Sequence, residues 1–256
     1  MDLTDPHNMG KSRNTRFINR VFTPREQELI SRAENQDAVL WALWAGKETA
    51  YKLIKKHDPS VTSVPRLYEV SLASAEESVG LSPGSNALTG FVATPHGSVQ
   101  IKVFITSDYV HCIGTTSASD EMDALVWHVD RISPDSQSCP DYESIFVRKA
   151  LKLRLSKCYN ESPENIEIRR VKSPYGLAPP FVCINGEPAA IDVSLSHDGL
   201  FAAYAFAVNA RVLRCLPFQK FIFHEIGNAL DVVDIQAGYS PIYGLVTRNG
   251  KKIIFS

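Results

Sequence analysis

Apolar and polar positions along the chain follow two different periods, and the change between them separates helical from strand-rich stretches. From Pro24 to about Lys56 apolar residues recur every three or four positions, which predicts a helical stretch, broken near Asn35. Thr23 and Glu26 have the spacing of a capping box, and a proline fits the first helical position between them. We therefore expect a sharply defined helix start after Thr23.

Between residues 59 and 116 the pattern changes to β-branched residues separated by turn-forming residues, which favours strands. A turn at His96 and Gly97 would connect the first two of these strands. The predicted strands cover residues 90–94, 99–106 and 109–114. A polar segment bracketed by prolines, residues 133–140, follows and has the composition of a linker.

The second half repeats the same order of elements, with a helix first and strands afterwards. A helix is predicted over residues 142–158, and strands over 166–168, 181–184, 191–196 and 201–208. The chain ends in a predicted hairpin, residues 242–247 and 252–255 around Asn249 and Gly250. The pattern predicts an α+β fold. We divide the chain into a first lobe (1–132), a linker (133–140), a second lobe (141–214) and an unassigned C-terminal extension (215–256).

The charge and the apolar content of the chain exclude several classes of protein function. The chain of 256 residues has 27 Lys and Arg against 28 Asp and Glu, a net charge of −1, which argues against a globally basic nucleic-acid-binding protein. Its longest apolar run, Leu200 to Val208, is too short to span a bilayer. The first residues have neither a basic segment nor an apolar one, so no secretory signal is expected. We predict a cytoplasmic protein that binds neither nucleic acid nor membrane.

The five cysteines are spaced singly and include no CxxC pair. Their odd number and spacing predict neither a disulfide framework nor a zinc site. We expect buried or incidental thiols. They are Cys112, Cys139, Cys158, Cys183 and Cys215.

Glu48 and Lys52 are the first candidates for chemistry. One helical turn separates them, so the carboxylate and the ammonium can reach a single ligand. A carboxylate suits Mg²⁺, which commonly bridges to phosphate, and an ammonium can neutralise a phosphate. An ordinary solvated Glu–Lys pair has the same spacing, so the pair alone does not decide between these interpretations.

Residues 193–199 (VSLSHDG) are the second candidate. Strand alternation places Val193, Leu195 and His197 on one face and the two serines on the other. His197 lies where the strand meets a glycine-containing turn, a position that can present an imidazole to a phosphate. A strand-end histidine bonded to backbone is the alternative. A catalytic triad with Ser196 is not expected, because neighbouring side chains point to opposite faces and no GxSxG motif is present.

Taken together, four segments resemble the 4′-phosphopantetheinyl transferase superfamily. They are residues 16–26 (RFINRVFTPRE), residues 44–52 (WAGKETAYK), the IEI and YG of residues 166–176, and the SLSHDG of residues 194–199. The resemblance implies a holo-acyl-carrier-protein synthase type of activity. Phosphopantetheine would pass from coenzyme A to a serine of an acyl- or peptidyl-carrier protein, with Mg²⁺ as cofactor.

The order of the segments differs from that of the large two-lobed members, in which the lobe with the SLSH strand comes first. Here the lobe with Lys47 and Glu48 precedes the lobe with His197. The resemblance therefore implies a pseudo-dimer of two lobes in swapped order, acting as a monomer. Its active site would lie in the cleft between the lobes.

The resemblance also assigns roles to residues. Glu48 would hold Mg²⁺ and Lys52 would neutralise the phosphate or the leaving 3′,5′-ADP, both as catalytic residues. Lys47, Ser196 and His197 would contact coenzyme A, and Asp2 would be a second metal ligand. A carrier protein usually docks through its acidic helix, and charge alone makes four basic residues near the N-terminus candidates to meet it, with an ordinary solvated face as the alternative: Arg13, Arg16, Arg20 and Arg25.

Three features depart from the family pattern. The family's G-x-D aspartate would precede Met1, and Asp2 aligns with the acid three residues after it. Leu177 and Ala178 replace the lysine of the YGKP motif, and residues 215–256 resemble none of the family's segments. The alternatives are a catalytically incomplete member that binds a carrier protein or coenzyme A, and an unrelated α+β protein.

Overall fold

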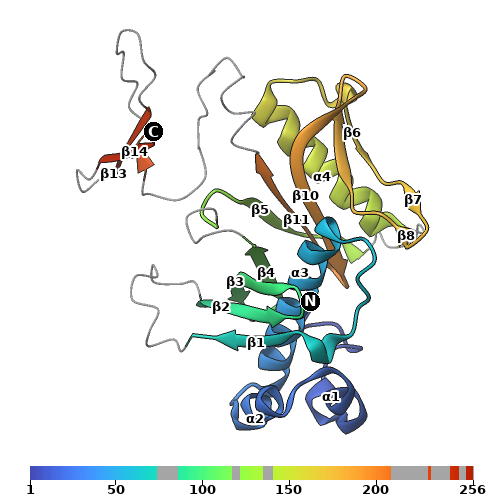
Figure 1. The fold of residues 1–256 in the computed structure, drawn as a ribbon, viewed down its shortest axis with the longest axis vertical. Coiled ribbons are helices and arrows are strands. Elements are labelled where there is room, and N and C mark those ends of the chain that lie inside the picture. The colour runs from blue at the N-terminus through green and yellow to red at the C-terminus, as the bar shows by residue number, and fades with distance from the viewer. Residues whose placement is uncertain are drawn as a thin grey trace. The chain divides into compact units, whose positions relative to one another are not determined.

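The structure is a computed structural model, which describes residues 1–73, 86–116, 122–134 and 141–208 and three strands near the C-terminus. The chain divides into two compact units, Met1–Arg214 and Cys215–Ser256. The first unit contains both helix-and-sheet layers shown in Figure 1 and all candidate site residues.

The helices Pro24–Arg32 and Gln36–His57 begin where the sequence predicts, whereas the helix Thr15–Val21 lies in a stretch for which none was predicted. Thr23 caps α2: its hydroxyl accepts from the backbone N–H of Glu26 at 3.4 Å, and the Glu26 carboxylate accepts from the Thr23 N–H at 2.8 Å. Asn35 caps α3 by accepting from the N–H of Ala38. The predicted capping box and helix break are therefore confirmed. The helical elements are η1 (Lys11–Arg13), α1 (Thr15–Val21), α2 (Pro24–Arg32) and α3 (Gln36–His57).

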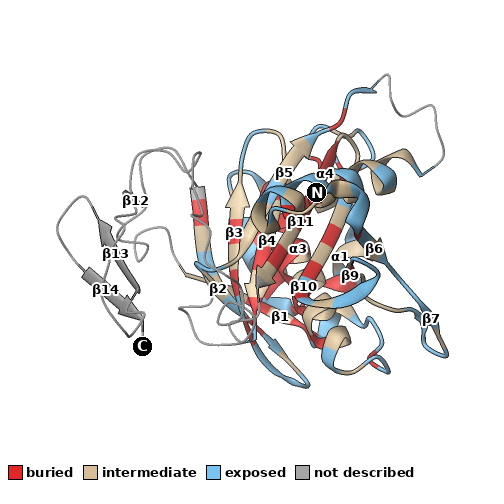
Figure 2. Ribbon diagram, turned by 90° about the horizontal axis from the view of Figure 1, so that it is seen from above, coloured by how far each residue is buried: buried red, intermediate tan, exposed pale blue. Residues whose placement is uncertain are grey.

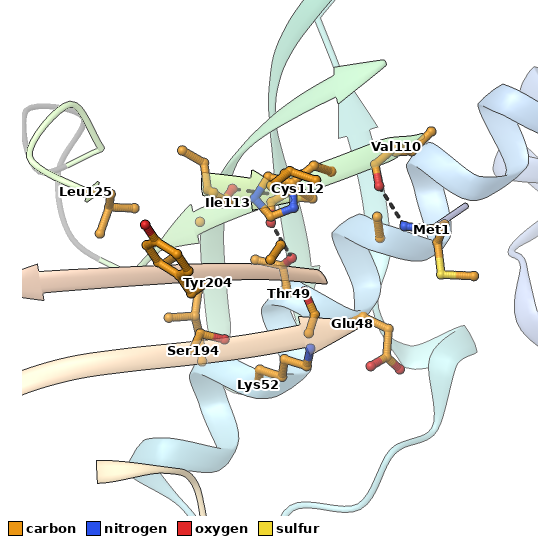
Figure 3. A pocket seen from close by; sticks show the side chains of 18 of the residues that line it. Met1, Glu48, Thr49, Lys52, Val110, Cys112, Ile113, Leu125, Ser194 and Tyr204 are labelled. Carbon is orange, nitrogen blue, oxygen red and sulfur yellow. Dashed lines mark hydrogen bonds between the residues drawn. The ribbon is translucent and has the colours of Figure 1, made fainter. Parts of the chain in front are cut away.

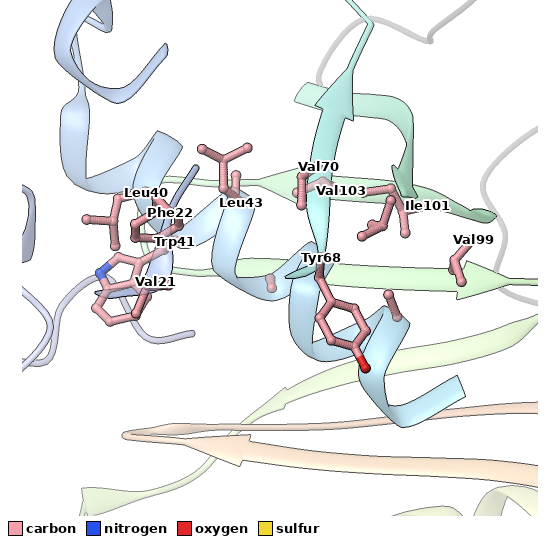
Figure 4. Close-up of a cluster of buried hydrophobic side chains, with 14 of the residues drawn as sticks. Val21, Phe22, Leu40, Trp41, Leu43, Tyr68, Val70, Val99, Ile101 and Val103 are labelled. Carbon is pink, nitrogen blue, oxygen red and sulfur yellow. The ribbon is translucent and has the colours of Figure 1, made fainter. Parts of the chain in front are cut away.

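The long helix α3 packs on an antiparallel sheet of sequential order, which Figure 1 shows in blue and green. At Gly46 the helix approaches so closely that an added Cβ would lie 3.1 Å from Val70 and from Ile101. The aromatic and aliphatic side chains of Figure 4 fill the space between helices and sheet. This layer contains η2 (Pro65–Leu67), β1 (Glu69–Leu72), β2 (Asn86–Thr94), β3 (Gly97–Ile105) and β4 (Val110–Thr115).

A second helix, α4 (Tyr142–Tyr159), covers one face of a five-stranded sheet of order β5-β11-β10-β9-β6. Buried and more exposed residues alternate along β10, as Figure 2 shows, and the buried set forms a separate hydrophobic cluster with α4. The remaining elements are β5 (Val126–Arg131), η5 (Pro163–Asn165), β6 (Ile166–Arg169), β7 (Lys172–Ser173), β8 (Gly176–Leu177), β9 (Phe181–Ile184), β10 (Glu187–Asp198) and β11 (Phe201–Val208). Helices and antiparallel sheets in these two layers confirm the α+β fold class.

Strand β5 lies within the range predicted for the first lobe, but it pairs with β11 of the second sheet. Its inward-facing Trp127 and Val129 stand opposite Ala205 and Ala203 in the ladder. The chain therefore passes from the first sheet to the second between β4 and β5, ahead of the predicted linker at 133–140. Residues 135–140 of that segment lie outside the described residues.

The C-terminal unit contains β12 (Leu230–Asp231), β13 (Tyr243–Thr247) and β14 (Lys252–Phe255). Strands β13 and β14 pair in antiparallel fashion, which confirms the hairpin predicted from the sequence.

The helices and cysteines of the described residues were also compared with the expectations from the sequence. None of their helices is long and apolar enough to cross a membrane. The thiols of Cys112, Cys158 and Cys183 are free, while Cys139 and Cys215 lie outside the described residues.

Candidate active site

A cavity of about 400 Å³ lies where helix α3 and the edge strand β4 face strands β10 and β11 (Figure 3). Glu48 and Lys52 line it from α3, and Ser196 and His197 line it from β10. The two sequence candidates, separated by more than 140 residues, are thus brought to one pocket.

Glu48 and Lys52 project from α3 in the same direction because they are one helical turn apart. The Lys52 ammonium donates to the Leu195 carbonyl at 3.4 Å. Burial lowers the pKa of Lys52, and the Glu48 carboxylate opposes this shift while Arg170 adds to it. Within the described residues the Glu48 carboxylate makes no hydrogen bond and no ion pair, so it remains available to a ligand.

Strand alternation on β10 decides which side chains reach the pocket. Val193 and Leu195 are buried in the cluster under α4, whereas Ser194 and Ser196 face the cavity. His197, at the end of the strand, lines this cavity and a second one beside it. The predicted separation of Val193 and Leu195 from the two serines is confirmed, whereas His197, predicted on the face of Val193 and Leu195, lines the pocket together with the serines.

The second cavity, of about 200 Å³, is strongly basic. Lys52 and His197 line it from the side of the larger pocket, and Arg148 of α4 and Arg170, just after β6, line it as well. No acidic residue belongs to this lining. Burial lowers the pKa of Arg170, and the neighbouring Arg148 adds to the shift. Clustered cations without a carboxylate favour an anionic ligand such as phosphate.

Arg148 and Arg170 are not among the site residues predicted from the sequence. They come from a helix and a loop that only the folded chain brings together with Lys52. Arg148 also donates to the Ser144 carbonyl at 2.9 Å, which fixes its guanidinium at the cavity. The sequence offered one signal: Arg148 is a basic residue within the helix predicted over residues 142–158, beside the predicted core of the second lobe.

Lys47, expected to contact coenzyme A, does not line either cavity. Its side chain is 2% exposed and its ammonium lies 2.7 Å from the Glu26 carboxylate, with further hydrogen bonds to the carbonyls of Pro65 and Tyr68. Burial lowers the pKa of Lys47, and Glu26 opposes that shift. The reason is helix geometry, because successive residues point about 100° apart, so Lys47 faces the first core while Glu48 faces the pocket.

Asp2, expected to be a metal ligand, is 1% exposed and is engaged by the chain itself. One carboxylate oxygen accepts from the N–H and hydroxyl of Thr4 at 2.8 and 2.7 Å, and the other accepts from the N–H of Leu200 at 2.8 Å. Burial raises the pKa of Asp2, but these hydrogen bonds outweigh it and hold the pKa below its usual value. The geometry favours a structural position, in which Asp2 joins the N-terminus to the β10–β11 turn.

The carboxylates of the pocket do not form a ready metal cluster. Asp192 pairs with Lys56 at 2.6 Å, and Asp198 accepts from the N–H of Asp2 and the side-chain amide of Asn8. The described part of the chain has no group of three His, Cys, Asp or Glu side chains that could hold a metal ion. Glu48 is therefore the carboxylate that the pocket offers to a ligand.

Comparison with known proteins supports the family resemblance of the N-terminal part of the chain. The family model of the 4′-phosphopantetheinyl transferase superfamily matches residues 1–79, which include α1 to α3 with Glu48 and Lys52. This match confirms the predicted superfamily resemblance over that part of the chain. No curated protein and no solved structure matched the chain in the corresponding searches.

The match supports phosphopantetheinyl transferase activity in general. Enzymes of this superfamily use coenzyme A as a substrate and typically a divalent metal ion. The match ends before the second sheet, so the contribution of β10 rests on the geometry of the pocket.

Proposed function

We propose that the protein transfers 4′-phosphopantetheine from coenzyme A to a serine hydroxyl of an acyl- or peptidyl-carrier protein, as a holo-acyl-carrier-protein synthase. The observation that carries this proposal is the meeting of Glu48 and Lys52 with Ser196 and His197 in one pocket. The family match at residues 1–79 supports it independently.

The reaction breaks one bond and forms another at phosphorus. The serine oxygen attacks the phosphorus that carries the pantetheine arm, a new O–P bond forms, and 3′,5′-ADP leaves with the bridging oxygen of the pyrophosphate. Such a step depends mainly on positioning and on neutralisation of charge. Lys52, half-buried beside the pocket, is placed to neutralise the phosphate and the leaving group.

The proton of the attacking serine needs an acceptor. The Glu48 carboxylate makes no hydrogen bond and no ion pair within the described residues, so it can accept this proton directly or through a water. The same two carboxylate oxygens of Glu48 would also bind a metal ion. We therefore assign both the acid–base role and the metal-binding role to Glu48.

The fit of Mg²⁺ to the pocket depends on the donors that are present. Mg²⁺ is commonly bound through one or two carboxylates, with phosphate oxygens and water completing its coordination. Glu48 would hold the ion against the pyrophosphate, whereas the Asp2 oxygens already accept hydrogen bonds. When bound, the ion would supply neutralisation of the pyrophosphate charge.

The basic cavity suits the second anionic part of coenzyme A, its 3′-phosphate. Arg148, Arg170 and His197 surround a space that adjoins the Glu48–Lys52 pocket through Lys52 and Ser196. Both phosphate groups of one ligand would then be held by neighbouring cavities. Within this proposal Ser196 and His197 contact coenzyme A and Lys47 supports α3.

Exposed basic residues near the N-terminus form the surface that would meet the carrier protein. Carrier proteins present an acidic helix, and Arg13, Arg16 and Arg20 are exposed near α1. Arg25, at the start of α2, is exposed as well and lies 4.0 Å from Glu69. We propose a cytoplasmic monomer, with two lobes related as a pseudo-dimer, that acts on a soluble carrier rather than on nucleic acid or membrane.

One observation favours a second candidate, a family member that binds coenzyme A or a carrier protein without transferring the group. Asp2 is engaged by the chain, and Glu48 is the one pocket carboxylate left without a described partner. A binding module would keep the basic cavity and lose turnover.

Intact mass of an apo acyl-carrier protein, measured after incubation with the full chain, coenzyme A and Mg²⁺, separates the two candidates. A phosphopantetheine-sized gain that disappears with EDTA supports the transferase. Saturable binding of coenzyme A without any gain in mass supports the binding module and contradicts the transferase.

A further inference from the structure

The two halves of the candidate site come from separate layers, so their separation depends on contacts between those layers. Glu48 and Lys52 belong to helix α3. Ser196 and His197 lie at the end of strand β10. A displacement of about 1 Å between such groups can slow a reaction about a hundredfold. Polar contacts that join α3 to the end of β10 are therefore candidates for a positioning role.

Asn8 makes such a connection. Its side-chain amide donates to the Asp198 carboxylate at 2.8 Å and to the Asp2 carbonyl at 2.9 Å. Its own backbone carbonyl accepts from the indole N–H of Trp41 at 3.0 Å. Trp41 is a buried residue of α3 (Figure 4), and Asp198 is the last residue of β10. One residue therefore joins helix α3 to the end of strand β10.

The geometry of this connection leaves it little freedom. Asn8 is 8% exposed and Trp41 is 4% exposed, so water competes weakly for their hydrogen bonds. The backbone N–H of Asn8 donates to the Asp5 carbonyl at 2.9 Å, which fixes the turn that presents the amide. The N–H of Asp2 donates to the same Asp198 oxygen at 2.7 Å. Two donors thus hold one carboxylate oxygen, and hydrogen bonds to a charged acceptor are among the stronger ones.

The restraint on Asp198 extends to the neighbouring histidine. Asp198 and His197 are consecutive in the ladder between β10 and β11, opposite Phe201 and Ala202. His197 lines both cavities, whereas Asn8 is not among the described residues that line either one. Because a fixed residue in a paired strand restrains the residue next to it, the hydrogen bonds to Asp198 also restrain the position of the His197 imidazole.

We propose that Asn8 is a positioning residue, which holds the end of strand β10 so that His197 and the Glu48–Lys52 pair keep the separation that one ligand requires. This inference rests on the proposed function and adds to it a residue outside the pocket. Loss of the Asn8 amide should weaken coenzyme A binding through His197, while the chemistry at Glu48 is preserved.

Asn8→Ala tests the proposal on the full chain. Isothermal titration should show an affinity for coenzyme A about three- to tenfold weaker, since a misplaced imidazole loses part of one hydrogen bond to a charged ligand. Steady-state kinetics with an apo acyl-carrier protein should show a rise in KM for coenzyme A and a kcat within about twofold of wild type. A merely structural role would lower the stability and leave this KM unchanged.

Asn35→Ala is the matched control. Asn35 caps the same helix α3 by accepting from the N–H of Ala38 at 3.0 Å, and it is not among the described residues that line the cavities. Loss of such a cap destabilises a protein. We expect an unchanged affinity for coenzyme A, so this variant separates the effect of lower stability from the effect of a displaced His197.

The His197→Ala background shows whether Asn8 acts through the histidine. With the imidazole removed, adding Asn8→Ala should weaken coenzyme A binding further by less than about twofold, because the effects of coupled residues are not additive. Losses that multiply in the double variant would overturn the proposal, as would wild-type affinity in Asn8→Ala alone.

Asp198→Ala removes the acceptor from the other side of the contact, should Asn8→Ala fold poorly. The same rise in KM with kcat preserved is expected, and an unchanged KM would contradict the proposal. The wild-type titration distinguishes failure of this inference from failure of the proposed function. A wild-type chain that binds no coenzyme A contradicts both. A wild-type chain that transfers phosphopantetheine, while both variants keep its KM for coenzyme A, contradicts the inference alone.

Discussion

The charge state of Lys52 depends on its surroundings. Its ammonium lies beside the pocket, where burial lowers its pKa, and the Glu48 carboxylate, Lys56 and Arg170 are the charged groups around it. Because the charged form of Lys52 is needed to neutralise phosphate, its deprotonation at alkaline pH removes this function.

We therefore expect the pH profile of kcat/KM to fall on its alkaline side, at a lower pH than an ordinary lysine would produce. Lys52→Arg should move this fall to higher pH, since a guanidinium stays protonated. The measurement is kcat/KM for coenzyme A between neutral and alkaline pH. An alkaline fall that stays in place in Lys52→Arg would contradict the assignment.

Lys47 differs from Lys52 in that its ammonium is engaged inside the first core rather than at the pocket. It is 2% exposed and pairs with Glu26, which is fully buried. Lys47→Met would leave the Glu26 carboxylate uncompensated in the core, so we expect a loss of about 3–5 kcal/mol in the free energy of unfolding. Urea denaturation measures this loss.

Lys55→Met on the same helix is the control for that variant, because Lys55 is less buried and bonds only the Tyr51 hydroxyl among the described residues. It should change stability by less than about 0.5 kcal/mol. Equal unfolding midpoints for wild type and Lys47→Met would show that the buried ion pair has no net role.

These two lysines also show how far the sequence predicts the site. Helical spacing identified Glu48 and Lys52 as neighbours on one face, and the structure places both at the pocket. The same pattern could not reveal that Lys47 meets Glu26, because that pair joins α2 to α3 through tertiary packing. A local motif identifies the helix but not the direction in which each of its residues points.

At the scale of elements, the β10–β11 turn and the N-terminus are held together by Asp2. Gly199 in this turn has φ +54°, and an added Cβ would lie 2.3 Å from the Asp2 carboxylate. Two effects therefore oppose any side chain there: left-handed backbone strain and displacement of Asp2.

Gly199→Ala should lower the free energy of unfolding by more than about 2 kcal/mol, since both effects act. Gly186→Ala is the matched control: its φ is +84° and nothing lies within 4 Å of the added Cβ, so it carries backbone strain alone. Urea denaturation of both variants compares the two effects. Equal losses would contradict the contribution of Asp2.

Strand periodicity predicted most strands of the two large sheets but neither β1 nor β5. The place of β5 is decided by its partner. Its residues pair with β11 across a sequence distance of 70 residues or more, and no local pattern specifies which sheet a strand joins. The helix α4 and strand β10 were predicted because the apolar spacing of the helix and the alternation of the strand are local properties.

At the scale of the whole molecule, the basic cavity depends on both layers. Lys52 comes from the first, while Arg148, Arg170 and His197 come from the second. No single segment of the sequence contains this cluster, which explains why the two arginines were not predicted.

Arg170→Gln should weaken coenzyme A binding about tenfold to a hundredfold, the range for a charge-assisted hydrogen bond. It should leave the affinity for dephospho-coenzyme A unchanged, because that ligand lacks the 3′-phosphate. Arg169→Gln, an exposed neighbour paired with Glu167, is the matched control. Equal losses for both ligands would place the 3′-phosphate elsewhere.

The central claim is that Glu48 belongs to the machinery of phosphopantetheine transfer. The most direct test is the rate at which an apo acyl-carrier protein gains a phosphopantetheine-sized mass with the wild-type chain, Glu48→Gln and the exposed control Glu28→Gln. We predict that Glu48→Gln is slower by at least about a hundredfold while Glu28→Gln matches the wild type. Transfer by Glu48→Gln at the wild-type rate would contradict the account.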